Sequence, residues 1–198
     1  MTNETWPEIK KRNMIERRGE IFDWVQSLVV ALLICVLTFT FLIREVSVSG
    51  TSMLNTLYHG DRLLISDLFY TPKQGDIVVL RKESFSVDPL VKRVIALAGQ
   101  TVDIDFDEGI VYVDGEPLDE PYIAEPTHRR IDFEGPMEVP EGCVFVLGDN
   151  RNGSTDSRDI RIGCIDVRLI MGKALMILIP GTDIDEEHRD WSRIGAVR

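Results

Sequence analysis

The sequence has few of the side chains that bind metals or build disulfide frameworks. Its 198 residues include three cysteines, at positions 35, 143 and 164, and three histidines. Cysteines this sparse and scattered match neither a zinc site nor a thioredoxin-like pair. We therefore expect no metal and no cofactor, and the sequence leaves open whether Cys143 and Cys164 form a disulfide.

The sequence also lacks an excess of positive charge. It has 22 lysines and arginines against 33 aspartates and glutamates, a formal net charge of −11, and no run rich in Lys and Arg. Binding to a phosphate backbone needs clustered positive charge. Nucleic acid is therefore excluded as an expected partner. Residues 1–45 carry equal numbers of acidic and basic side chains, so the negative charge belongs to residues 46–198.

One segment has no formal charge at all. Val25–Ile43 would span about 28 Å as an α-helix at ~1.5 Å per residue, close to the thickness of a bilayer core. We interpret residues 21–44 as one transmembrane helix; a buried core helix and a cleaved signal peptide are the alternatives. Basic residues precede the segment and only Arg44 follows closely, which predicts a cytoplasmic segment at 1–20 and an extracytoplasmic domain at 45–198.

The rest of the chain is predicted to be mostly β, because short apolar runs alternate with turns rich in Gly, Pro and Asp. Asp114-Gly115 fits a two-residue hairpin turn. Residues 105–142 are rich in acids and prolines, so we expect a small inserted subdomain there. The predicted strands are Arg62–Ser66, Ile77–Leu80, Leu90–Leu97, Thr101–Ile104, Ile110–Val113, Val144–Leu147 and Leu169–Ile179.

Three places in this domain carry candidate chemistry. Ser52 follows soon after the apolar segment, Lys92 lies in an otherwise apolar strand, and residues 148–158 form a loop rich in Asp, Asn and Arg. No histidine lies in a context typical of a catalytic triad. Together the three places supply a nucleophile, a base and a polar loop to hold that base, which is the Ser-Lys form of nucleophilic catalysis.

A lysine acts as a base only in its neutral form. Its ordinary pKa of ~10.4 must fall by about three to populate the free amine near pH 7. Burial among apolar neighbours lowers the pKa of a lysine, whereas a nearby carboxylate raises it. We therefore expect Lys92 to lie in an apolar setting, and an acid beside it would oppose the mechanism.

These segments resemble four sequence boxes of the bacterial type I signal peptidases, in the single-anchor form typical of Gram-positive bacteria. The boxes are Gly50–Leu57, Gly75–Val79, Val91–Ile95 and Gly148–Arg158. The resemblance implies a signal-peptidase-like β domain in the cell membrane. It also implies a serine endopeptidase that removes signal peptides from exported preproteins after small residues. Preproteins, membrane lipid and the secretion translocon are the partners it implies.

The resemblance assigns a role to each matching residue. Ser52 would be the nucleophile and Lys92 the general base, with Ser154 hydrogen-bonded to the lysine amine. The supporting residues it implies are an ion pair of Asp156 with Arg158, and Asp149, Asn150 and Arg151 in the loop behind the site. Gly50, Thr51 and Met53 would belong to the oxyanion hole and to the strand that receives the substrate.

The sequence departs from the family pattern beside the nucleophile. Gly50 stands where some members have a serine whose hydroxyl completes the oxyanion hole. The Ser52 backbone N–H and a second main-chain N–H would then have to stabilise the oxyanion. Asn55 stands where the family usually has proline.

Two other functions remain open at this point. One is a self-cleaving or regulatory Ser/Lys peptidase, similar to the repressors of the SOS response, which carry a DNA-binding domain where this chain has an apolar segment. The other is a non-catalytic, membrane-anchored β domain. The complete Ser, Lys and Ser set argues against the second.

Overall fold

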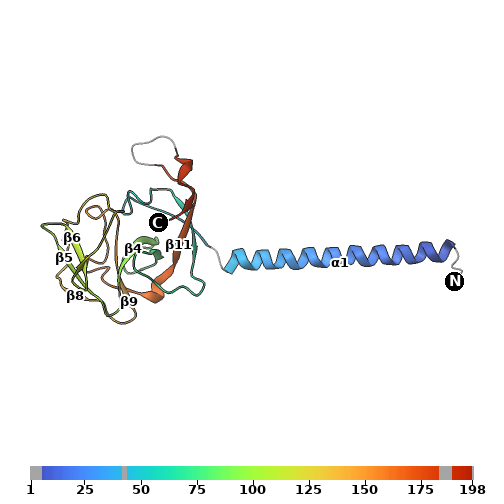
Figure 1. Ribbon diagram of the computed structural model, residues 1–198, viewed down its shortest axis with the longest axis horizontal. Coiled ribbons are helices and arrows are strands. Elements are labelled where there is room, and N and C mark those ends of the chain that lie inside the picture. The colour runs from blue at the N-terminus through green and yellow to red at the C-terminus, as the bar shows by residue number, and fades with distance from the viewer. Residues whose placement is uncertain (1–5, 42–43, 183–188, 198) are drawn as a thin grey trace. The chain divides into compact units, whose positions relative to one another are not determined.

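The computed structural model describes residues 6–41, 44–182 and 189–197. The chain divides into two compact units, Met1–Leu42 and Ile43–Arg198 (Figure 1). The first contains α1 (Trp6–Phe41), and the last two residues of the predicted span, Leu42 and Ile43, lie outside the described residues. Within the described residues, no helix combines the length and the apolar character needed to cross a membrane.

The second unit is mostly β, as the sequence predicts. Its larger sheet is antiparallel throughout, with the order β1-β2-β11-β3-β4-β9-β10, and β12 also pairs with β11. The strands of this sheet are β1 (Arg44–Ser47), β2 (Arg62–Ser66), β3 (Ile77–Leu80), β4 (Leu90–Leu97), β9 (Cys143–Leu147), β10 (Ile165–Asp166), β11 (Ile170–Ile179) and β12 (Gly195–Ala196). Short 3₁₀ turns lie at Val167–Leu169 and Trp191–Arg193.

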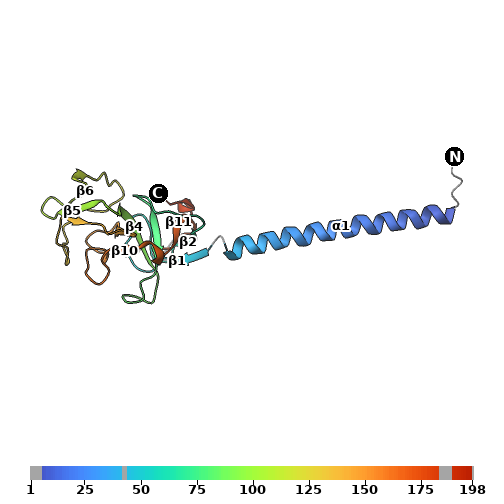
Figure 2. The same ribbon diagram turned by 90° about the horizontal axis from the view of Figure 1, so that it is seen from below.

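A smaller sheet has the order β7-β6-β5-β8. Its strands are β5 (Thr101–Asp105), β6 (Ile110–Val113), β7 (Glu116–Pro117) and β8 (Met137–Glu138). In both views β5 and β6 lie on the opposite side of the domain from β11 (Figure 1; Figure 2). Residues 105–142, predicted as an insertion, therefore supply β6 to β8, and the sheet itself begins earlier, at Thr101.

The hairpin turn between β6 and β7 confirms the prediction made from Asp114-Gly115. Both residues have positive φ, 55° for Asp114 and 83° for Gly115. The strands pair directly on either side of them, Val113 with Glu116. Two consecutive positive φ values match the twist of the flanking strands, and Asp and Gly accept such values at low cost.

The apolar side chains form three buried clusters, of which one carries the loop around Ser52. In it Met53 and Leu57 pack against residues of β2, β3, β4 and β11. Both side chains are almost fully buried, with exposed fractions of 1% and 0%. Burying side chains of this size contributes about 1.5–3 kcal/mol each. The loop is therefore held to the core immediately after Ser52.

Candidate active site

The loop from residue 48 to residue 61, called here the serine turn, is closed by its own backbone. The Val48 N–H donates to the Asp61 carbonyl (2.8 Å), and the Gly60 N–H donates to the Val48 carbonyl (2.9 Å). Inside the turn, the N–H groups of Thr56 and Leu57 both donate to the Met53 carbonyl at 2.8 Å. These bonds satisfy the backbone where the chain leaves the sheet and fix the path through Ser52.

Ser52 and Lys92 meet although forty residues separate them. Lys92 lies in β4 opposite Val78 of β3, and only 3% of it is exposed. Its Nζ lies 2.7 Å from Ser52 Oγ and also donates to the Val91 carbonyl at 3.1 Å. A hydroxyl and an amine at this distance can exchange a proton directly.

Burial lowers the pKa of Lys92 from 10.5 to about 8. Desolvation of the ammonium is the largest cause; Asp156 and Asp149 oppose it, and Arg158 adds to it. At ~1.36 kcal/mol per pKa unit, the protein destabilises the charged form by roughly 3 kcal/mol. About a tenth of the protein therefore carries the neutral amine at pH 7, and about half at pH 8.

The loop at 148–158 contacts the backbone on either side of the Ser52 peptide group. The Asn150 side-chain Nδ2 donates to the Thr51 carbonyl (3.0 Å), and the Asn150 backbone N–H donates to the Ser52 carbonyl (3.1 Å). Gly148 lies against the same carbonyl: a Cβ at this position would overlap the Ser52 oxygen and the Ser154 side chain. Only glycine allows this close approach.

Buried ion pairs hold the loop in place. Asp149 accepts from Arg93 Nε (2.9 Å) and Nη2 (2.7 Å), and also from the Thr56 hydroxyl. The Asp156 and Arg158 pair implied by the family resemblance is present, with Nε to Oδ1 at 2.8 Å. Asp156 also accepts from the Gly148 N–H (3.0 Å). Both acids that raise the pKa of Lys92 are thus paired with arginines.

One residue lies differently from what the resemblance implies. Among the described residues, Ser154 Oγ is buried without a hydrogen-bond partner, so the expected bond to the Lys92 amine is not formed. The Met53 side chain, next to Ser52, is part of the core.

The contacts from the inserted segment could not be predicted from the sequence. Arg151 forms a bidentate ion pair with Glu120 and also donates to Thr127 Oγ1 (3.0 Å). The Arg93 guanidinium lies 3.8 Å from the centre of the Tyr122 ring. Segment 120–127 therefore contacts the loop through Arg151 and strand β4 through Arg93. In an acidic, proline-rich stretch, the local sequence around a polar residue is the same whether its side chain is solvated or binds a distant residue of the fold.

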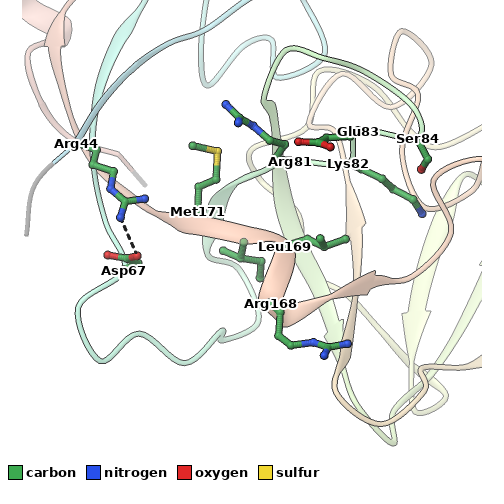
Figure 3. A pocket seen from close by; sticks show the side chains of 10 residues that line it. Arg44, Asp67, Arg81, Lys82, Glu83, Ser84, Arg168, Leu169 and Met171 are labelled. Carbon is green, nitrogen blue, oxygen red and sulfur yellow. Dashed lines mark ion pairs between the residues drawn. The ribbon is translucent and has the colours of Figure 1, made fainter. Parts of the chain in front are cut away.

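A separate hollow lies elsewhere on the domain (Figure 3). The residues that line it include Arg44, Asp67, Arg81 and Arg168, but neither Ser52 nor Lys92. Arg44 and Asp67 face each other across one side of it, 3.6 Å apart.

Cys143 and Cys164 are both free, and burial raises the pKa of the Cys164 thiol to about 11.

Comparison with known proteins places this site in a family. The family model described as signal peptidase, peptidase S26, matches residues 21–179. The chain belongs to this family. A signal peptidase I of Bacillus licheniformis is 35% identical over 179 residues, covering 85% of this chain and 94% of that one. Signal peptidase I P of Bacillus subtilis subsp. natto is 34% identical over 174 residues, covering 83% and 92%.

Among solved structures, a signal peptidase I from Enterococcus faecalis V583 is 29% identical. It covers 52% of this chain and 97% of that one, with a TM-score of 0.45. Membership of the S26 family makes the protein a serine endopeptidase. The whole site described above, from the serine turn through Arg158, lies within the matched residues.

Proposed function

We propose that the protein removes signal peptides from exported preproteins, with Ser52 as the nucleophile and Lys92 as the general base. The observation that carries this proposal is the 2.7 Å contact between Lys92 Nζ and Ser52 Oγ. The burial of the amine and its pKa of about 8 support it, because a general base works best when its pKa lies near the working pH.

The reaction follows from this geometry. The neutral amine takes the Ser52 proton as Oγ attacks the scissile carbonyl, and the new ammonium then protonates the leaving amine. Water replaces the leaving peptide, gives a proton to the amine and attacks the acyl-serine; the Lys92 ammonium then returns this proton to Ser52 Oγ as the carboxylic acid of the signal peptide is released. The Ser52 backbone N–H would stabilise the oxyanion of each tetrahedral intermediate.

The sheet offers a place for an extended substrate beside Ser52. In β4, Leu90 and Val91 pair with β3, whereas pairing with β9 begins only at Arg93. Among the described strands, the other side of Leu90–Lys92 is therefore left without a partner. A peptide added here as a strand would pass directly beside the amine of Lys92.

The location of the protein is also part of the proposal. We propose that Val25–Ile43 anchors it in the cell membrane as a single span, with residues 1–20 in the cytoplasm and the β domain outside. The uncharged run and the basic residues before it support this arrangement. Membrane lipid and the secretion translocon would then be its neighbours, and preproteins crossing the same bilayer its substrates.

Cleavage of a preprotein by the purified full-length chain tests the function. The wild type in detergent micelles should release a mature protein that begins after a small residue, and S52A should release none. Equal cleavage by wild type and S52A would refute the proposed nucleophile. Protease added to spheroplasts tests the topology: digestion of residues 1–20 in intact spheroplasts would refute it.

A further inference from the structure

The imidazole of His59 contacts the backbone two residues before Ser52. The Gly50 N–H donates to His59 Nδ1 at 3.1 Å. Because Nδ1 accepts this bond, it carries no hydrogen, so the imidazole is neutral and its hydrogen is on Nε2. The His59 side chain is exposed, and the mechanism proposed above does not use it.

Gly50 has an open, left-handed backbone conformation within the serine turn. Its φ is +92°, and no atom lies within 4 Å of the position a Cβ would occupy. A glycine in open space has more backbone freedom than any other residue. The backbone before it is tied at Val48, and the carbonyls of Thr51 and Ser52 after it are tied to Asn150. Between these anchors, His59 holds the Gly50 N–H.

We propose that His59 is a positioning residue for Ser52. Its neutral imidazole accepts the hydrogen bond from the Gly50 N–H and so fixes the backbone at Gly50. This keeps Ser52 Oγ next to the Lys92 amine. The proposal rests on the Ser52 and Lys92 function proposed above. It has a second consequence: the Gly50 N–H is occupied, so it does not serve as the additional main-chain donor of the oxyanion hole.

Protonation of the imidazole would break this contact. A protonated histidine has no acceptor, because both ring nitrogens carry hydrogen. The charged groups next along the turn are already paired, Asp61 with Arg193 and Arg62 with Glu45. The backbone of Gly181, which packs against the His59 carbonyl, adds no charge.

On the acid side, log(kcat/KM) should fall with a slope near one between about pH 8 and pH 7 as Lys92 gains its proton. Wild type and His59 variants are therefore compared above pH 8, where the Lys92 amine is mostly neutral.

Three variants test this with the full chain and a cleavable preprotein. H59L removes the acceptor and should lower kcat about fivefold, the effect of one hydrogen bond of ~1 kcal/mol, with KM changed less than twofold. H59N keeps an acceptor oxygen near the position of Nδ1, so it should restore kcat to the wild-type value. H128N is the matched control, since His128 Nδ1 contacts the Phe106 carbonyl (3.0 Å) outside the serine turn; it should behave as wild type.

Each result decides the proposal. Wild-type kcat in H59L would overturn it, as would an H59N variant as slow as H59L. If H59L does not fold, H59A replaces it as the variant without an acceptor, and wild-type kcat in H59A overturns the proposal. These results are distinguishable from a failure of the proposed nucleophile, because a wrong nucleophile would appear as cleavage by S52A.

Discussion

Arg93 binds both carboxylate oxygens of Asp149 and is the residue directly after Lys92 in β4. Strand alternation turns the two neighbouring side chains to different surroundings, so the arginine reaches the acid while the lysine reaches Ser52. The carboxylate near the amine is thereby paired, as Asp156 is by Arg158. Desolvation then outweighs the two acids in setting the pKa of Lys92. From the sequence we expect a nearby acid to oppose the mechanism, but both acids here are paired with arginines.

The first prediction concerns the pH dependence of activity. Because the folded pKa of Lys92 is about 8, kcat/KM should rise with pH through 8 and level off above it. K92R should be inactive at every pH tested, since a guanidinium with a pKa above ~12 keeps its proton. The measurement is initial cleavage rate from pH 6 to pH 10. Turnover by K92R would remove the lysine from the mechanism.

The second prediction concerns stability. The pKa of Lys92 is lowered on folding, so the unfolded chain binds more protons between about pH 8 and pH 10.5. The free energy of unfolding should therefore rise across this window by up to roughly 3 kcal/mol from this residue, and the full penalty remains below pH 8. Urea unfolding of S52A against S52A/K92M isolates the effect, because other groups titrate alike in both. Identical pH dependence in the two proteins would contradict it.

The third prediction separates function from stability at Ser154. Its hydroxyl is buried without a partner among the described residues, and such a group costs about 1–3 kcal/mol. S154A should therefore unfold at a temperature equal to or above that of the wild type. If the hydroxyl orients the amine once substrate is bound, kcat should fall about tenfold, the effect of ~1.4 kcal/mol. Thermal unfolding and kcat together check both halves, and lower stability would show that the hydroxyl has a partner.

The fourth prediction concerns Gly148. In G148A the new Cβ would overlap both the Ser52 carbonyl and the Ser154 side chain, so Ser52 must move. We expect kcat to fall by about 100-fold, since small misplacements of a reacting group cost this much. Adding S154G removes one overlap and leaves the other, so it should not restore activity. Full recovery in the double variant would show that Ser154 alone limits the space.

The fifth prediction concerns the ion pair at the end of the serine turn. Arg193 binds both oxygens of Asp61, at 3.0 and 2.7 Å, at the end of the serine turn. Asp61 is fully buried, so R193M should destabilise the fold by about 3–5 kcal/mol through the unpaired carboxylate. R189M, at an exposed arginine of the same segment, is the control. D61N/R193M should recover part of the loss, and no difference between R193M and R189M would contradict the prediction.

The sequence predicted the strands with strong local patterns and missed those without them. Four strands, β2, β3, β4 and β6, have the predicted bounds because each is an apolar run ended by turn residues. Two-residue strands such as β10 and β12 contain too few residues to show any alternation. Their existence depends on the strand beside them.

The residues of the candidate site also divide into those that a local motif indicates and those that it does not. Motifs within single segments pointed to Ser52, Lys92 and the loop at 148–158. The contacts of Glu120, His59 and Arg193 depend on segments that meet only in the folded chain, and nothing in the local sequence of a charged residue reports its distant partner. The unpartnered Ser154 hydroxyl likewise follows from the space around it rather than from its motif.

The Asp61 and Arg193 pair also has a consequence for the timing of synthesis. The two residues are 132 apart in the chain, so a ribosome working at about 5–20 residues per second needs on the order of ten seconds between them. During that interval the serine turn has been synthesised but Arg193, the partner of Asp61, has not. A nascent chain therefore carries Ser52 throughout this interval, before Arg193 can pair with Asp61 and complete the serine turn.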